Sequence, residues 1–194
     1  MKRLILTTII ILTFGLTAHA ANWNLDNAHS SIGFSVRHMV ISKTTGKFSD
    51  YSGTVDFDGK NLDKASIDIT ISMASINTED EDRDKHLKGP DFLDAAKFPE
   101  MTFKSSKITA GTDSEFKITG MLTIKGVSKE VTLEAEFNGI IDDPWGNTRA
   151  GFTAETTIDR QDFNVSFDNK LKDGSLIVGN DIKIMLEIEL VKAK

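Results

Sequence analysis

The chain has 194 residues, a formal net charge of −6 at neutral pH and no cysteine, which predicts one domain or at most two. The acidic balance argues against nucleic acid as a partner and against electrostatic docking to anionic lipid surfaces, because both require basic patches. The lack of cysteine excludes disulfides and a lipid-modified cysteine, so a hydrophobic core must hold the fold together.

The first twenty residues have the pattern of a secretory signal peptide. Lys2 and Arg3 give a positive start, an apolar run follows, and Ala18 and Ala20 are the small residues that a signal peptidase reads. The apolar run is short for a membrane span, and an uncleaved anchor is the alternative interpretation. We expect cleavage after Ala20, which removes two cations and leaves a domain over residues 21–194 with a charge of −8. Export without disulfides suits a periplasmic protein.

Apolar side chains recur at every second position through most of the mature chain, which is the period of half-buried β-strands. The inward positions are, in chain order, Ile32, Phe34, Val36 and His38; Val55 and Phe57; Ile67, Ile69, Ile71 and Met73; Met101, Phe103 and Ser105; Phe116, Ile118, Gly120, Leu122 and Ile124; Val131, Leu133, Ala135 and Phe137; Ala150, Phe152, Ala154, Thr156 and Ile158; and Ile182, Ile184, Leu186, Ile188 and Leu190. Turn signals such as DDPWGN and KDGS separate these runs. About eight strands at short spacing predict an antiparallel sandwich or barrel.

One segment, residues 78–88, breaks the alternation with the sequence TEDEDRDKHLK. Its acids come first and its bases later, which suits the dipole of a short helix. Thr78 and Glu81 match a capping box, in which each side chain satisfies a free amide at the helix start. The acids at 80–84 also have calcium-loop spacing, but Lys85 replaces the glycine that such a loop requires. We therefore predict one short helix on an otherwise all-β domain.

His29 and His38 flank the first predicted strand and are the first candidates for a metal or catalytic pair. They are nine positions apart, and an odd separation on a regular strand places side chains on opposite faces. We expect no shared metal site, and we interpret His38 as a hydrogen-bonded histidine of the apolar face. The chain also lacks a G-x-S-x-G nucleophile motif, a P-loop and a dinucleotide fingerprint. Hence the sequence predicts no enzyme, cofactor or metal.

The apolar face either packs into a solid core or encloses a ligand. Two features favour a cavity for a linear hydrocarbon. Small residues at inward positions leave space, and aromatic residues provide rigid walls. The small residues are Gly120, Ala135, Ala150 and Ala154, and the aromatic residues are Phe34, Phe57, Phe103, Phe116, Phe137 and Phe152.

Four blocks in order resemble the YceI-like family of exported bacterial proteins, over nearly all of the mature chain. The blocks are WNLDNAHSSIGFSVRHMVISKTTGKFSDYSGTVDF, INTEDEDRDKHLKGPDFLDAAKFPEMTFKSSKI, GMLTIKGVSKEVTL and IDRQDFNVS. The second block holds family-typical residues at Arg83, His86, Leu87, Asp91, Phe92, Phe98 and Pro99. The chain departs from the family at Gly89 and Pro90, where small polar residues are usual, at Leu93, where a second aromatic is common, and at Asn164, where glycine is usual.

The resemblance implies an extended eight-stranded antiparallel lipocalin-like barrel with one short helix and an internal hydrophobic tunnel. Characterised members bind polyisoprenoids such as isoprenoid quinones, and no enzymatic activity is established for the family in general. Some members are linked to stress, and some to isoprenoid transport or storage. The departures lie in loops beside the barrel mouth, so they bear on ligand selectivity more than on the fold.

We therefore predict a periplasmic protein that holds a polyisoprenoid chain for carriage, storage or stress protection. The predicted ligand-binding residues are Ile32, Phe34, Val36, His38, Phe57, Ile69, Ile71, Phe103, Phe116, Ile118, Phe137, Phe152, Arg160, Ile184 and Leu186. His38 and Arg160 are the polar candidates for orienting a head group, and Arg83 and His86 are secondary ones. For Arg83 the alternative is a salt bridge to a helix acid, and for Arg160 it is a structural role in tying down the QDF segment.

The expected partners are the lipid itself and no nucleic acid, and transient contact with the inner membrane or a homodimer is left open. Two other functions also remain open. One is an enzyme acting on a lipid-like substrate, for which His38 and Arg160 would be the polar cluster. The other is a structural or interaction module with a fully packed barrel.

Overall fold

The alternating segments form strands in a computed structural model that describes residues 22–193, so the predicted signal peptide lies outside the described residues. The strands are β1 Asn22–Leu25, β2 Ser31–His38, β3 Ser42–Phe48, β4 Tyr51–Asp56, β5 Ser66–Ser72, β6 Ile76–Asn77, β7 Glu100–Ala110, β8 Glu115–Ile124, β9 Val127–Asp142, β10 Thr148–Asp159 and β11 Val178–Lys192. The helices are α1 Glu81–Leu87 and three short 3-10 turns, η1 Leu62–Lys64, η2 Met73–Ser75 and η3 Arg160–Phe163. In this part of the chain, no helix is long and apolar enough to cross a membrane.

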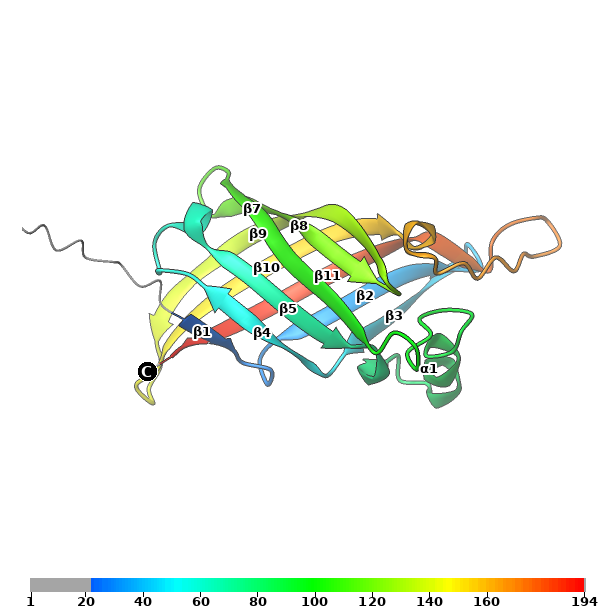
Figure 1. Ribbon diagram of the computed structural model, residues 1–194, viewed down its shortest axis with the longest axis horizontal. Coiled ribbons are helices and arrows are strands. Elements are labelled where there is room, and N and C mark those ends of the chain that lie inside the picture. The colour runs from blue at the N-terminus through cyan, green and yellow to red at the C-terminus, as the bar shows by residue number, and fades with distance from the viewer. Residues whose placement is uncertain (1–21, 194) are drawn as a thin grey trace, which may run out of the picture.

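All the strands belong to one antiparallel sheet that closes on itself, because β1 pairs with both β4 and β11. Three strand positions of the barrel are each filled by two short strands that lie end to end. β1 and β2 both pair with β11. On their other side, β1 pairs with β4 and β2 pairs with β3, and then β4 pairs with β5 and β3 pairs with β6. With β7 to β11 this makes eight strand positions, which confirms the predicted eight-stranded barrel. Figure 1 shows the elongated result, with α1 at one end and the C-terminus at the other.

The helix is present but begins later than the sequence suggested, and the predicted capping box is wrong. The N-cap is Asp80, whose carboxylate accepts the backbone N–H of Arg83 at 3.0 Å. Thr78 lies outside the helix, and both its N–H and its hydroxyl donate to Asp84, at 2.8 and 2.6 Å. An aspartate at the N-cap satisfies the same free amides as a threonine would, so the acids of this segment are helix-start residues.

Two strands differ from the expected alternation. A bulge between Ser105 and Lys107 shifts the register of β7, so that Ile108 rather than Lys107 is buried. The hydroxyl of Ser105 instead accepts the backbone N–H of Ile67 at 2.9 Å. Near the chain start, the four-residue strand β1 was missed because it is too short to show a period. Its Trp23 donates a hydrogen bond to the carbonyl oxygen of Phe57 at 2.8 Å and so ties β1 into the barrel.

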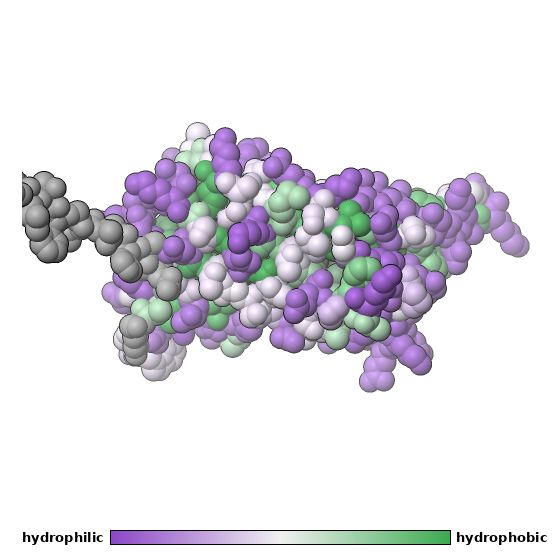
Figure 2. Space-filling model, in the orientation of Figure 1, coloured by the Kyte–Doolittle hydropathy of each residue, from purple (hydrophilic) through white to green (hydrophobic). Residues whose placement is uncertain are grey.

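The inward faces of the strands carry the apolar residues, and the outward faces carry charges. Cross-strand ion pairs lie on the outside, such as Lys117 with Glu134 and Lys183 with Glu155, each at 2.7 Å. Figure 2 shows hydrophilic and neutral side chains over most of the face in view, with apolar residues in small patches. The barrel therefore places its apolar surface in its interior, where the candidate site lies.

Candidate functional site

The interior of the barrel holds an apolar cavity of about 270 Å³. It extends from Val36 and Val178, at the α1 end, to Leu62 and Leu190, at the opposite end. All but two of the predicted ligand-binding residues line it, and these are Ile32, Phe34, Val36, Phe57, Ile69, Ile71, Phe103, Phe116, Ile118, Phe152, Arg160, Ile184 and Leu186. The barrel thus brings together side chains from eight different segments of sequence, and contact of these residues with a ligand stays a prediction.

Phe137 and His38 are the two predicted residues that do not line the cavity. The ring of Phe137 packs against Phe57 and Phe152, with centroids 6.0 and 5.1 Å apart, so these two rings lie between Phe137 and the cavity. His38 is half-buried at the very end of β2, opposite Ser42. The cavity lining ends at Val36, one inward position earlier.

Two of the four small inward residues border the cavity, namely Ala135 and Ala154. They face each other across β9 and β10. Gly120 does not, because the ring of Phe103 fills its place: a Cβ at Gly120 would lie 2.6 Å from that ring. Ala150 belongs to the packed cluster around Trp23. Small residues therefore create room only where no aromatic ring covers them.

Among residues 22–193, Arg160 is the only ionisable residue that lines the cavity, and it is only 3% exposed. Its guanidinium, however, is engaged with the protein. Nε donates to the carbonyl of Gly179 at 2.9 Å, and the terminal nitrogens donate to the carbonyls of Val165, Phe167 and Val178. This geometry fits the structural alternative, in which Arg160 ties residues 160–167, here called the η3 segment, to β11.

Arg83 and His86 lie on α1, outside the cavity. Arg83 donates from Nε to the hydroxyl of Thr78 at 2.8 Å, and its ion pair with Asp80 is long, at 3.8 Å. His86 stands edge-on to the rings of Phe92 and Phe167, with centroids 5.0 and 5.5 Å away. Both residues therefore hold the helical segment in place.

Five apolar lining residues at the α1 end were missed by the sequence reasoning. They are Leu87, Phe92, Leu93, Phe163 and Val165. They come from α1, from the loop after it and from the η3 segment, where no alternation marks a buried face. The stacked rings of Phe92 and Phe167, 4.7 Å apart, join these two segments across the end of the barrel.

The model of the YceI-like domain family matches residues 23–190. The chain belongs to the YceI-like family. Protein YceI of Salmonella newport is 44% identical over 154 residues, which cover 78% of this chain and 80% of that protein. Among solved structures, a YceI protein of Campylobacter jejuni is 38% identical with a TM-score of 0.71 and covers 88% of this chain and 97% of that chain. A polyisoprenoid-binding domain from Saccharophagus degradans is 14% identical with a TM-score of 0.66, over 88% and 98% of the two chains, which shows a shared fold.

The departures of this YceI-like chain from its family gather at the α1 end of the cavity. Leu93 lines the cavity directly, and Gly89 anchors the loop by accepting the N–H groups of Phe92 and Asp94. Asn164 follows η3 with a positive φ of 56°. Glycine is favoured at such a position, and asparagine tolerates it better than most residues do. The substitution of asparagine for the family glycine is thus compatible with the backbone.

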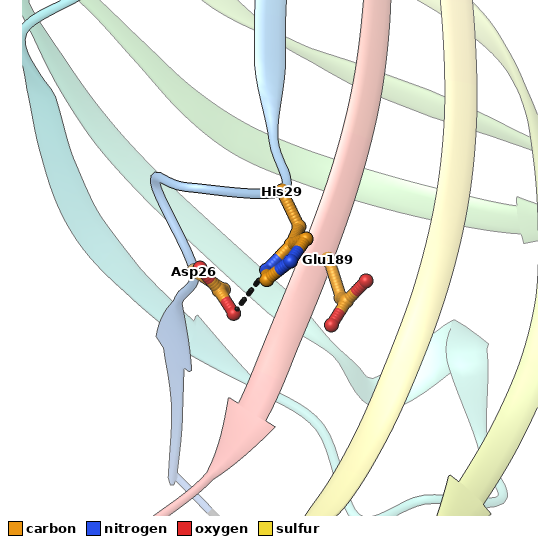
Figure 3. A group of neighbouring side chains, drawn as sticks. All are labelled: Asp26, His29 and Glu189. Carbon is orange, nitrogen blue, oxygen red and sulfur yellow. Dashed lines mark hydrogen bonds and ion pairs between the residues drawn. The ribbon is translucent and has the colours of Figure 1, made fainter. Parts of the chain in front are cut away.

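The far end of the YceI-like barrel carries a polar cluster of Asp26, His29 and Glu189 (Figure 3). One potential ligand atom from each residue lies within 4.8 Å of the others, which is metal-site spacing. Arg149 nevertheless occupies this cluster, because its Nη1 donates to both Asp26 and Glu189 while its Nε donates to Asp143. The guanidinium already pairs with all three carboxylates, so the cluster is typical of a structural charge network.

Arg149 sets the expected acid response of the fold. Its hydrogen bond, followed by that of His29, lowers the pKa of Asp26 to about 2, and it also holds the pKa of Asp143 far below the ordinary value. A carboxylate with a lowered folded-state pKa stabilises the fold above its unfolded-state pKa, near 4, and loses that contribution as the pH falls through the folded-state value. We expect the melting temperature to fall as the pH decreases from about 4 to about 2.

The variant Arg149→Met tests this network. It should lower the melting temperature by several degrees at pH 7 and should weaken the acid dependence between pH 4 and 2. Hydrogen bonds with Asn61 lower the pKa of Asp58 to about 2. Asp58 therefore remains as a smaller source of acid dependence in this variant. Lys104→Met removes an exposed ion pair with Asp68 and is the control, expected to change little. An unchanged acid profile in Arg149→Met would contradict the assignment.

Proposed function

We propose that this protein binds lipid and holds a polyisoprenoid chain, such as an isoprenoid quinone or a polyprenyl compound, inside its barrel. The observation that carries the proposal is the apolar cavity, in which the one ionisable lining residue is engaged with backbone carbonyls. Such a wall offers a hydrocarbon chain burial without exposing it to unpaired charge. The polyisoprenoid-binding domain of Saccharophagus degradans has the same fold and so supports this ligand class.

The driving force for binding would be hydrophobic. Each buried methylene contributes about 0.8 kcal/mol, so a chain of a few isoprene units exceeds the ordering costs of binding. The cavity of about 270 Å³ lies just below the range of ligand sites, which is about 300–1,000 Å³. We therefore propose that side chains of the wall move apart when a long chain enters.

The setting of this function is part of the proposal. We propose that the protein acts in the periplasm, where it holds the lipid for carriage, storage or stress protection, with transient contact with the inner membrane. A homodimer would be compatible with the same role. Binding rather than catalysis fits the lining, since in the described chain no set of ionisable groups meets inside the cavity.

Identification of the bound lipid tests the proposal. The protein is purified from its native host, extracted with organic solvent, and the extract is analysed by mass spectrometry. We expect prenyl lipid at close to one molecule per protein, and none in an extract of an unrelated exported protein purified in parallel. Repeated preparations without prenyl lipid, combined with no uptake of added isoprenoid quinone, would overturn the proposal.

A further inference from the structure

The turn between β2 and β3 exposes three consecutive apolar residues, Met39, Val40 and Ile41, here called the tip. Their side chains are 39%, 57% and 86% exposed. Isolated apolar residues on a surface are ordinary, but a run of three at the end of a hairpin is not. The tip therefore presents a compact apolar projection to its surroundings.

The backbone of the tip is strained as well. Met39 and Val40 have φ values of 48° and 65°. A β-branched residue such as valine rarely adopts a positive φ, whereas glycine adopts it freely and asparagine tolerates it. The sequence thus places residues that suit neither water nor the backbone at the same positions, which is expected where function rather than stability determines the residues.

Two cations flank the tip. Arg37 on β2 lies directly opposite Lys43 on β3, and both are exposed. Like charges in this cross-strand arrangement repel each other, so an anionic partner would stabilise them. The loop before β11, residues 164–177, adds no net charge, because it carries Lys170 and Lys172 together with Asp168 and Asp173. The acids of α1 at the same end of the barrel oppose an anionic surface, so the match to a phospholipid bilayer is local. It consists of an apolar projection with two basic residues at its base.

The tip also lies at the α1 end of the cavity. The N–H of Met39 donates to the carbonyl of Ile177 at 2.8 Å, and the next residue, Val178, lines the cavity together with Val36. Figure 1 shows the β2–β3 turn, α1 and the loop before β11 at this same end, opposite the C-terminus. A membrane touched by the tip would therefore face the end of the cavity that the α1 and η3 segments close.

We propose that the tip docks this protein on a phospholipid bilayer, with Met39, Val40 and Ile41 inserted among the lipid chains and with Arg37 and Lys43 at the phosphate groups. The inference rests on the proposed function, since a protein that holds a lipid chain must collect or deliver it at a membrane. The negative charge of the whole chain makes insertion of the tip, rather than long-range attraction, the source of affinity.

Sedimentation with vesicles of phosphatidylethanolamine and phosphatidylglycerol tests the proposal. The protein used for this test begins at Ala21, because residues 22–193 close the barrel by themselves and the apolar sequence before Ala21 could bind vesicles independently of the tip. We expect Ile41→Asp to lower the partition coefficient about tenfold or more, since it removes an inserted side chain and adds a repelled charge. Ile141→Asp is the matched control: Ile141 is 64% exposed next to the opposite end of the barrel, and its variant should bind as the parent does.

A second variant separates docking from folding. Met39→Asn combined with Val40→Gly supplies residues that tolerate the positive φ values of these two positions, so the melting temperature should rise while vesicle binding falls about tenfold. Loss of docking in a more stable protein cannot come from unfolding. Arg37→Gln with Lys43→Gln should lower binding to a lesser extent, about threefold or more.

Three results would overturn the proposal: no vesicle binding by the parent protein, equal binding by the parent and Ile41→Asp, or loss of binding in Ile141→Asp alone. A concentration-dependent dimer that Ile41→Asp dissociates would show that a second copy covers the tip instead, and would also overturn it. The lipid content of the parent protein, measured by extraction, tests the proposed function independently of vesicle binding. The two proposals can therefore fail separately.

Discussion

Replacing Arg160 with methionine is expected to lower the free energy of unfolding by about 3–5 kcal/mol. The methionine side chain keeps much of the apolar stem but leaves the carbonyls of Val165, Phe167, Val178 and Gly179 without their donor. An unpaired buried carbonyl costs about 1–3 kcal/mol, and partial hydration recovers some of that cost. The sum is large because one side chain serves four backbone acceptors.

Urea unfolding, followed by the fluorescence of buried Trp23, measures this loss. Arg37→Met is the matched control, since Arg37 is exposed on β2 and its replacement should change the unfolding free energy by less than about 0.5 kcal/mol. Arg160→Lys should recover only part of the loss, because one ammonium cannot reach the acceptors that a planar guanidinium spans. A loss below about 1 kcal/mol in Arg160→Met would show that water replaces the guanidinium, against the structural role.

The same contacts explain why sequence reasoning could not assign Arg160. Its inward position near the end of a strand follows from the alternation, but its partners come from segments 5 to 20 residues away. An arginine facing a ligand and an arginine holding a loop look alike in a sequence. The distances decide between them, because every nitrogen of Arg160 is within hydrogen-bonding reach of a protein acceptor.

Alternation predicts the cavity wall well in the middle of the strands and fails at their ends. Ile32, Phe34 and Val36 line the cavity as predicted, because they share one face of β2, on which Ile32 and Val36 are buried and Phe34 is half-buried. His38, two residues further, is already beyond it. The parity argument for His29 rested on a wrong premise, since His29 lies in the turn before β2 and pairs with Asp26 at 2.9 Å.

The closure of the α1 end could not be predicted by any periodicity. Phe92 and Phe163 line the cavity from non-strand segments that meet only in the folded protein. The family-typical places of Leu87 and Phe92 were the available sequence signals for this closure. Likewise, β1 closes the barrel by pairing with β4 on one side and with β11 on the other. Its partners on β11, residues 190–192, lie at the opposite end of the sequence. Long-range pairing of this kind leaves no local pattern.

Ala154→Phe is expected to reduce the lipid content of the protein about tenfold or more. Ala154 lines the cavity between Ala135 on β9 and Leu186 on β11, which line it too. A phenylalanine ring here would occupy the space left by two facing alanines. Since each buried methylene contributes about 0.8 kcal/mol and about 1.4 kcal/mol is a factor of ten, displacing only two methylenes is enough for the effect.

Lipid extraction with mass spectrometry, together with a melting curve, checks this prediction. Overpacking of a filled core costs about 1–3 kcal/mol, but a ring that enters a cavity fills a void, so we expect the melting temperature of the variant to fall only slightly. Ala110→Phe adds the same ring at an exposed position near the end of β7 and should keep the full lipid content. If Ala154→Phe folds and still carries as much prenyl lipid as the parent, the chain does not lie along this cavity. A drop confined to Ala154→Phe would place the lipid between β9, β10 and β11, and would make the room left by Ala135 and Ala154 the feature that separates a ligand-holding barrel from a packed one.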